Sequence, residues 1–149
     1  MKSNRVNVLG VGISPINLQL AEELVFEAIH SGQQGYVGVT GVHGVSEAFT
    51  DKSFRDILNN AYLNTPDGMP MVWYARIYGF EKVSRVYGPD LMLNILARSN
   101  KENVKHFFYG GGEGVADLLK EKLEKKFPGI EIVGTYTPPF RPLTNDEEI

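Results

Sequence analysis

The sequence predicts an α/β fold in which helices flank a mostly parallel sheet. Short runs rich in β-branched and aromatic residues alternate with longer runs whose apolar residues recur at helical spacing. Glycine or proline ends most of these runs. Strands that alternate with helices form βαβ crossovers, which place the strands in parallel. We therefore expect a Rossmann-like sheet in a single domain that covers residues 1–149.

The first half of the chain contains three strand candidates, at residues 6–9, 36–42 and 62–65. Its helix candidates lie at residues 15–29, 52–60 and 69–78, with a short helical turn at 45–49. Ser14 precedes a proline at the first helical position, and Asp51 precedes the second helix, so both should act as N-caps. The third helix has little polar surface. We expect it to be buried, with Trp73 in the core or in the wall of a pocket.

The second half continues the alternation. Gly88-Pro89-Asp90 opens a helix that runs through Ala97, and residues 104–109 form a strand. A glycine-rich turn leads into a helix that ends at Phe127, and the last strand follows at residues 130–135. These elements complete the predicted order of strands and helices.

Thr144 to Glu147 have the pattern of a capping box, in which Thr caps a helix and Glu follows three residues later. Such a box announces a helix, yet the sequence ends at Ile149. Two interpretations are open from this signal: the front part of a longer protein, or a frayed polar tail.

The composition narrows the class of protein. Of 149 residues, 42% are hydrophobic and 22% charged, as in a globular domain with a core of its own. The net charge of −3 argues against a nucleic-acid-binding surface. The absence of cysteine excludes disulfides and thiolate metal sites. The first residues lack a signal-peptide core and no apolar run could span a membrane, so we expect an intracellular protein with at most peripheral membrane contact.

The glycine-rich turn at residues 110–114 is the first candidate site. It joins a strand to a helix, where backbone N–H groups and the helix dipole can hold a phosphate. A tight turn explains one or two of its four glycines, and phosphate binding is an equally good interpretation. The run Gly10-Val11-Gly12 at the first strand-to-helix turn lacks a third glycine, so we expect a structural role there.

Asp67 lies in the Thr65-Pro66-Asp67-Gly68 turn directly after a strand candidate. The pattern suits an ordinary turn, but the ends of strands are also where α/β sheets place ligands. Thr40 ends the preceding strand in the same way. His43, just beyond it, is a candidate base or hydrogen-bond donor, or else a satisfied, partly buried histidine.

Arg85 and Asp90 flank a Gly-Pro pair. Arg85 could hold a diphosphate or carboxylate through two hydrogen bonds, whereas a solvated arginine and a helix-capping aspartate are the plainer alternatives. The sequence has no Asp-x-Asp pair, and no spacing of His, Asp and Glu indicates a metal site. We therefore expect neither a metal nor another cofactor.

Taken together, these segments resemble the WecG/TagA/CpsF family of glycosyltransferases (glycosyltransferase family 26). The Thr-Pro-Asp-Gly-Met-Pro-Met-Val-Trp and Arg-Val-Tyr-Gly-Pro-Asp-Leu blocks form a specific combination. The similar stretches occur in the family's order and cover nearly the whole chain, at residues 39–44, 65–73, 85–91, 107–111 and 134–140.

The resemblance implies an inverting, metal-independent enzyme. It would transfer N-acetylmannosamine, its uronic acid or a related hexose from a UDP-sugar to a sugar linked to polyprenyl diphosphate. Such enzymes serve the assembly of teichoic acid, enterobacterial common antigen, capsule or exopolysaccharide. They work in the cytoplasm at the inner face of the cell membrane, and a homo-oligomer is possible.

The resemblance also assigns roles to residues. Asp67 corresponds to the proposed general base, Thr40 to a threonine near the donor sugar and a second candidate catalytic residue, and Arg85 to an arginine of the same cleft. The glycines Gly110, Gly111 and Gly112 would approach the nucleotide. The role of His43 stays open. Asp90 and Tyr136 lie in matching blocks and are further candidates for substrate binding.

Members of the family usually continue past this point. They carry a Gly-Leu-x-x-Pro-Lys-Gln-Glu block that helps form the donor site, and a C-terminal appendage tied to membrane association. The resemblance therefore implies that this chain is an N-terminal portion. The alternative functions are a nucleotide-binding module without catalysis and an NAD-type oxidoreductase, the latter disfavoured by the incomplete glycine fingerprint.

Overall fold

The computed structural model describes residues 5–142 and residue 144. The chain divides into two compact units, residues 1–94 and 95–149. In the described residues the strands form three two-stranded sheets, two of them parallel. The predicted α/β class, with parallel strands flanked by helices, is therefore confirmed, whereas a single Rossmann-like sheet stays a prediction. The capping box predicted at 144–147 lies outside the described residues, apart from Thr144.

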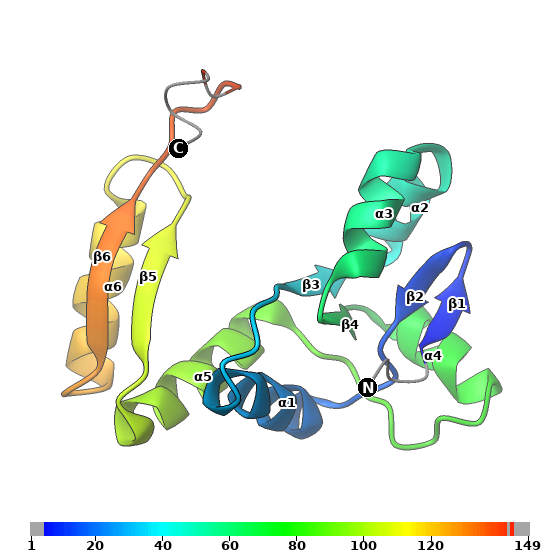
Figure 1. Cartoon of the computed structure of the whole chain (residues 1–149), viewed down its shortest axis with the longest axis horizontal. Helices are drawn as coiled ribbons and strands as arrows, with labels where there is room; N and C mark the ends of the chain where they lie inside the picture. The colour runs from blue at the N-terminus through cyan, green and yellow to red at the C-terminus, as the bar shows by residue number, and fades with distance from the viewer. Residues whose placement is uncertain (1–4, 143, 145–149) are drawn as a thin grey trace. The chain divides into compact units, whose positions relative to one another are not determined.

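The first unit opens with an antiparallel hairpin of β1 (Val6–Val8) and β2 (Val11–Ile13) (Figure 1). Its parallel pair consists of β3 (Val37–Thr40) and β4 (Leu63–Pro66), in which Thr40 lies opposite Pro66. The helices of this unit are α1 (Leu18–His30), α2 (Val42–Thr50), α3 (Lys52–Asn60), α4 (Met69–Ile77) and the start of α5 (Gly88–Glu102).

The hairpin replaces the single strand predicted at residues 6–9. Gly10 adopts a φ of +92° in the turn, and its N–H donates to Asn7 Oδ1 at 2.8 Å. Gly12 lies within β2. The Gly10-Val11-Gly12 run therefore covers the end of the hairpin turn and the start of β2, and its prediction as a strand-to-helix turn was wrong. Both strands turn apolar side chains into the core: Val6, Val8, Val11 and Ile13.

Ser14 does not cap the first helix, contrary to our prediction. Its N–H donates to the Asn64 carbonyl at 2.8 Å, and its Oγ accepts from the Asn64 N–H at 3.1 Å, so it extends the contact between β2 and β4. Helix α1 begins at Leu18, with Asn17 as the N-cap. Asp51 caps α3 as predicted, by accepting from the Phe54 N–H at 3.0 Å.

Helix α4 is buried on one side only, rather than on all sides as predicted. Met71, Val72 and Ala75 pack into the core with the hairpin. Trp73 and Ile77 are exposed, so the core placement predicted for Trp73 was wrong. The core lies on one side of α4, so it buries only the side chains on that side, which are spaced three or four residues apart.

Asn64 is a buried polar residue that joins three strands of the first unit. Its Nδ2 donates to the Gly12 carbonyl of β2 at 3.1 Å, and its Oδ1 accepts from Thr40 Oγ1 of β3. Its main chain exchanges hydrogen bonds with Ser14. Because Asn64 is fully buried, no water can replace these partners.

The second unit is a βαβ crossover of β5 (Lys105–Tyr109), α6 (Val115–Lys126) and β6 (Glu131–Tyr136), preceded by the rest of α5. Strands β5 and β6 are parallel, with Tyr109 opposite Tyr136. Helix α6 packs along both strands (Figure 1). The Thr135 hydroxyl donates to Asp117 and so ties β6 to α6. The buried apolar side chains of this unit are Leu96, Ala116, Leu123, Ile130 and Ile132.

We predict that Asn64→Leu lowers the free energy of unfolding by several kcal/mol, at roughly 1–3 kcal/mol for each buried group that loses its partner. The matched control is Asn59→Leu. Asn59 also bonds the hairpin, through the Gly12 N–H and the Gly10 carbonyl, but it is exposed, so water can replace it. Urea unfolding would measure both. Equal losses for the two variants would contradict a special role for the buried amide.

Candidate active site

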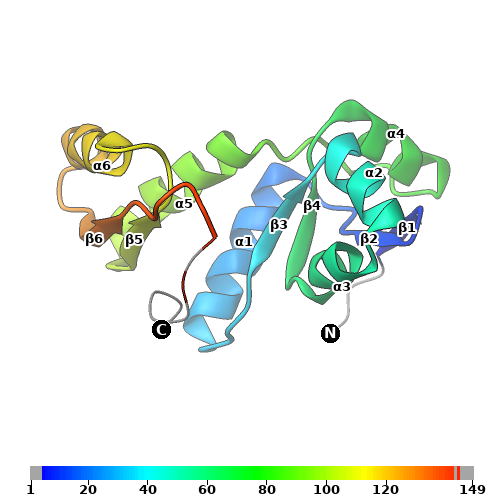
Figure 2. The ribbon, with the colours of Figure 1, turned by 90° about the horizontal axis from the view of Figure 1, so that it is seen from above.

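The carboxyl ends of β3 and β4 form one edge of the first unit. Strands β3 and β4 run side by side (Figure 2), and because they are parallel and in register, Thr40 lies opposite Pro66 at their carboxyl ends. Helix α2 begins two residues after Thr40, and α4 begins three residues after Pro66. This is the edge at which α/β sheets place ligands, next to helix N-termini.

Backbone contacts fix the position of Asp67 at this edge. The Asp67 N–H donates to the Thr40 carbonyl at 3.0 Å, which continues the β3–β4 ladder by one residue. A Cβ atom on Gly41 would lie 2.8 Å from the Asp67 carbonyl oxygen, so the two loops approach more closely than any side chain at position 41 allows. Gly68 has a φ of +111°, which favours glycine and turns the chain into α4.

The loop that carries Arg85 is anchored to the same edge. The Val86 N–H donates to the Pro66 carbonyl at 2.9 Å. This places the Arg85 Nε 2.9 Å from Asp67 Oδ1, in a charge-assisted hydrogen bond. The guanidinium also lies over the Tyr87 ring, 4.7 Å from its centroid. Two contacts therefore orient Arg85 toward the Asp67 carboxylate.

The Asp67–Arg85 pair is open to solvent. The side chains are 26% and 49% exposed, respectively. A pair this exposed contributes about 1 kcal/mol or less to stability, because water screens it. Its main effect is on geometry: it engages one oxygen of the carboxylate, Oδ1. An oriented, accessible carboxylate can accept a proton from a hydroxyl group placed beside it.

Thr40 connects the site to the buried Asn64. Its side chain is buried, and its hydroxyl donates to Asn64 Oδ1. The structure thus brings Thr40, Asp67 and Arg85 together, and Asn64 contacts Thr40. We did not single out Asn64 from the sequence. Its signal was an asparagine within a strand, where that residue is uncommon, directly before the Thr-Pro-Asp-Gly turn.

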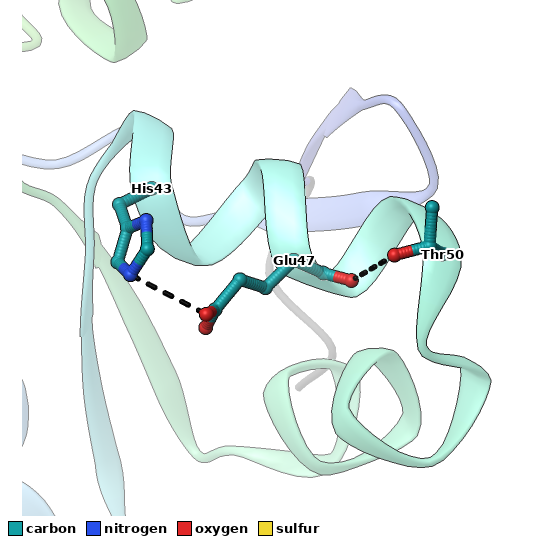
Figure 3. A network of polar contacts seen from close by, with 3 residues as sticks. All are labelled: His43, Glu47 and Thr50. Atoms are coloured by element: carbon teal, nitrogen blue, oxygen red, sulfur yellow. Dashed lines mark hydrogen bonds and ion pairs between the residues drawn. The ribbon is translucent and has the colours of Figure 1, made fainter.

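His43 and Asp90 stand apart from this network. His43 lies in the first turn of α2 with its side chain 88% exposed, so of its two alternatives the partly buried histidine was wrong, and the base or hydrogen-bond donor stays a prediction. Figure 3 shows its Nε2 directed at Glu47 on the same helix, at 3.4 Å, while the Thr50 hydroxyl donates to the Glu47 carbonyl at 3.2 Å. Asp90 is exposed in the first turn of α5, a favourable position for an acidic side chain.

The glycine-rich turn belongs to the second unit, between β5 and α6. Gly110, Gly111 and Gly114 have φ values of +109°, +79° and +74°, so backbone conformation accounts for three of the four glycines. The Gly110 N–H donates to the Tyr136 carbonyl at 2.9 Å, which extends the β5–β6 ladder. Gly112 accepts from the Val115 N–H at 3.1 Å.

Tyr136 therefore lies beside this turn, with its ring 5.8 Å from that of Tyr109. Helix α6 starts after Gly114 without a side-chain cap. A turn of this kind at a helix N-terminus directs backbone N–H groups toward an anion. Gly110, Gly111, Gly112 and Tyr136 thus form a second group of candidate residues within the second unit.

In the described part of the chain, no three His, Asp or Glu side chains gather as a set of metal ligands. None of the helices resolved in residues 5–142 has the length and apolarity that a membrane span requires.

We predict that Gly41→Ala destabilises the protein by roughly 1–3 kcal/mol, because the new methyl group displaces the Asp67 turn. Gly44→Ala, within the helix that Gly41 precedes, is the control. Its Cβ would lie 3.4 Å from the Thr40 methyl group, and alanine favours the helix, so we expect no loss. Thermal unfolding followed by circular dichroism would compare them. Similar melting temperatures would show that the turn accommodates a side chain at position 41.

Comparison with known proteins agrees with these features. The chain is 32% identical over 88 residues to the N-acetylglucosaminyldiphosphoundecaprenol N-acetyl-beta-D-mannosaminyltransferase of Bacillus spizizenii, and 29% identical over 87 residues to the enzyme of the same name from Bacillus subtilis. The matched segments cover 59% and 58% of this chain but 34% of each relative, so the chain spans about a third of their length.

A profile of the Glycosyl transferase WecG/TagA/CpsF family matches residues 6–149. The match includes both groups of candidate residues. The chain therefore belongs to the WecG/TagA/CpsF family of glycosyl transferases.

Proposed function

We propose that the protein containing this chain is an inverting glycosyltransferase. It moves N-acetylmannosamine, its uronic acid or a related hexose from a UDP-sugar to a sugar on a polyprenyl diphosphate, in the synthesis of a cell-surface polysaccharide or teichoic acid. Family membership supports the reaction class, and the names of the Bacillus relatives support a diphosphoundecaprenol-linked acceptor. Such an acceptor implies work at the inner face of the cell membrane through peripheral contact.

The observation that carries this proposal is the position of Asp67. Its accessible carboxylate lies at the carboxyl end of a parallel strand pair and is oriented by Arg85. In the reaction, Asp67 takes the proton of an acceptor hydroxyl. The hydroxyl oxygen forms a bond to the anomeric carbon of the donor as the bond from that carbon to UDP breaks. UDP leaves with the electron pair, and attack opposite to it inverts the configuration.

Arg85 has two tasks in this scheme. Its Nε holds Asp67, and its remaining N–H donors can face the negative charge of a diphosphate. The glycine turn and the N-terminus of α6 are the proposed contacts to the UDP phosphates, with Tyr136 beside them. Thr40 positions the strand end that carries Asp67. His43 and Asp90 are proposed as outer substrate contacts. The proposed chemistry needs no metal ion.

We predict that Asp67→Asn in the full-length protein lowers the rate of sugar transfer by about 100-fold or more, the usual contribution of a general base. The amide keeps the shape of the side chain but cannot take the proton. Donor binding and the melting temperature should stay near the wild-type values. Asp56→Asn, an exposed carboxylate on α3, is the control. Turnover at the wild-type rate in Asp67→Asn would exclude Asp67 as the base.

We also predict that UDP raises the melting temperature of the full-length protein, since a ligand stabilises the state that binds it. NAD should leave it unchanged. Transfer should persist after dialysis against EDTA. A loss of transfer that Mg²⁺ or Mn²⁺ restores would contradict metal independence. Binding of UDP without any transfer would indicate a nucleotide-binding module instead of an enzyme.

A further inference from the structure

An apolar groove lies in the first unit, between the tip of the β1–β2 hairpin and the helices α2 and α4. Its volume is about 360 Å³, within the range of small-molecule sites. The residues that matter for its chemistry are Leu9 of the hairpin, Val42 and Phe49 of α2, and Pro70, Met71 and Tyr74 of α4.

One end of the groove lies next to the candidate active site. Val42 follows Thr40 by two residues, and Pro70 follows Asp67 by three. Both residues lie in the first turns of helices that start at the same strand edge. The two helices that flank the Asp67 turn therefore also form two walls of the groove, and a ligand could occupy both places at once.

The lining carries no charge. The hydroxyl of Ser46 and that of Tyr74 are its only polar side-chain groups. Tyr74 lies 3.2 Å from the Tyr78 hydroxyl, a hydrogen bond that raises the pKa of the Tyr74 phenol, so this group stays neutral. A sugar or a phosphate would lose its hydration in such a groove without gaining partners. A hydrocarbon loses nothing by entering it and gains from leaving water.

The groove also presents large apolar side chains that are open to solvent. Leu9 is 61% exposed and Phe49 is 60% exposed. Helix α4 also exposes Met69, Trp73 and Ile77, which follow one another at four-residue spacing. Large exposed apolar side chains along the wall of a groove mark a binding surface more often than an ordinary protein surface.

We propose that the groove holds the isoprene units of the acceptor nearest its diphosphate. This inference rests on the proposed function, in which the acceptor is a sugar, a diphosphate and a polyprenyl chain in that order. The chemistry of the site matches these three parts: Asp67 is ready for the sugar hydroxyl, Arg85 supplies positive charge for a diphosphate, and the neutral groove suits the hydrocarbon. The groove thereby selects a polyprenyl-linked acceptor over a free sugar diphosphate.

The test measures binding of farnesyl diphosphate, a short polyprenyl diphosphate, to the full-length protein by calorimetry, with inorganic diphosphate as the chain-free probe. Farnesyl diphosphate should bind more tightly than inorganic diphosphate. Phe49→Asp should weaken farnesyl diphosphate binding about tenfold or more, since it places a charge beside the hydrocarbon. Binding of inorganic diphosphate should not change.

Two further variants make this result specific. Leu9→Asn removes an apolar wall, and asparagine tolerates the φ of +51° at this position, so the hairpin should keep its fold. It should also weaken farnesyl diphosphate binding. Ile57→Asp is the control: Ile57 is 54% exposed on α3 and does not line the groove. It should bind both probes as the wild type does.

Several results would overturn the proposal. They are equal affinity for the two probes, unchanged farnesyl diphosphate binding in both groove variants, or weaker binding in Ile57→Asp as well. A wild-type dimer that dissociates in Phe49→Asp while farnesyl diphosphate still binds would make the groove an interface between two copies. If Phe49→Asp weakens binding to phosphatidylcholine vesicles without polyprenyl lipid as much as it weakens farnesyl diphosphate binding, the groove is a contact to the bulk membrane.

The same variants separate this proposal from the proposed function. In transfer assays Phe49→Asp should raise the KM for an acceptor that carries isoprene units, but leave the KM for a sugar diphosphate acceptor without a hydrocarbon chain unchanged. If the wild type transfers sugar and Phe49→Asp does not change the KM for either acceptor, the proposed function holds and the proposed role of the groove is excluded. If farnesyl diphosphate binding depends on Phe49 but the wild type transfers sugar to no acceptor, the proposed function is excluded and the proposed role of the groove holds.

Discussion

The buried side chain of Asn64 holds the first unit together at the point where its chemistry is placed. One amide group joins β2 through Gly12 and β3 through Thr40, while its own main chain belongs to β4. A buried amide with both ends satisfied fixes the relative position of its partners far more strictly than apolar packing does. The hairpin, the parallel pair and therefore the strand edge that carries Asp67 all depend on it.

The two halves of the proposed acceptor site follow from this arrangement. The β3–β4 ladder continues to the Asp67 N–H, so the Asp67 turn is an extension of the sheet. The same hairpin that Asn64 anchors contributes Val8 and Leu9 to the apolar groove. A rigid polar edge and an apolar groove are thus built on one framework, which suits a substrate that is polar at one end and hydrocarbon at the other.

Much of the local structure could be predicted from the sequence, because it is set by local chemistry. The Asp51 cap, the turn at Pro66-Asp67-Gly68 and the crossover helix after the glycine turn all follow from residues close in sequence. Contacts across many residues could not be predicted in this way. Ser14 has the pattern of a helix cap, but its bond partner is Asn64, fifty residues away. The Asp67–Arg85 pair and the exposure of Trp73 likewise depend on how the elements pack.

The Asp67–Arg85 contact has an electrostatic consequence for the edge on which it lies. A carboxylate alone would repel an approaching diphosphate, and the chain as a whole carries a net charge of −3. The adjacent guanidinium brings the local sum of charge close to zero, so an anionic molecule meets little repulsion there. The pair can therefore offer a proton acceptor to a negatively charged substrate without turning that substrate away.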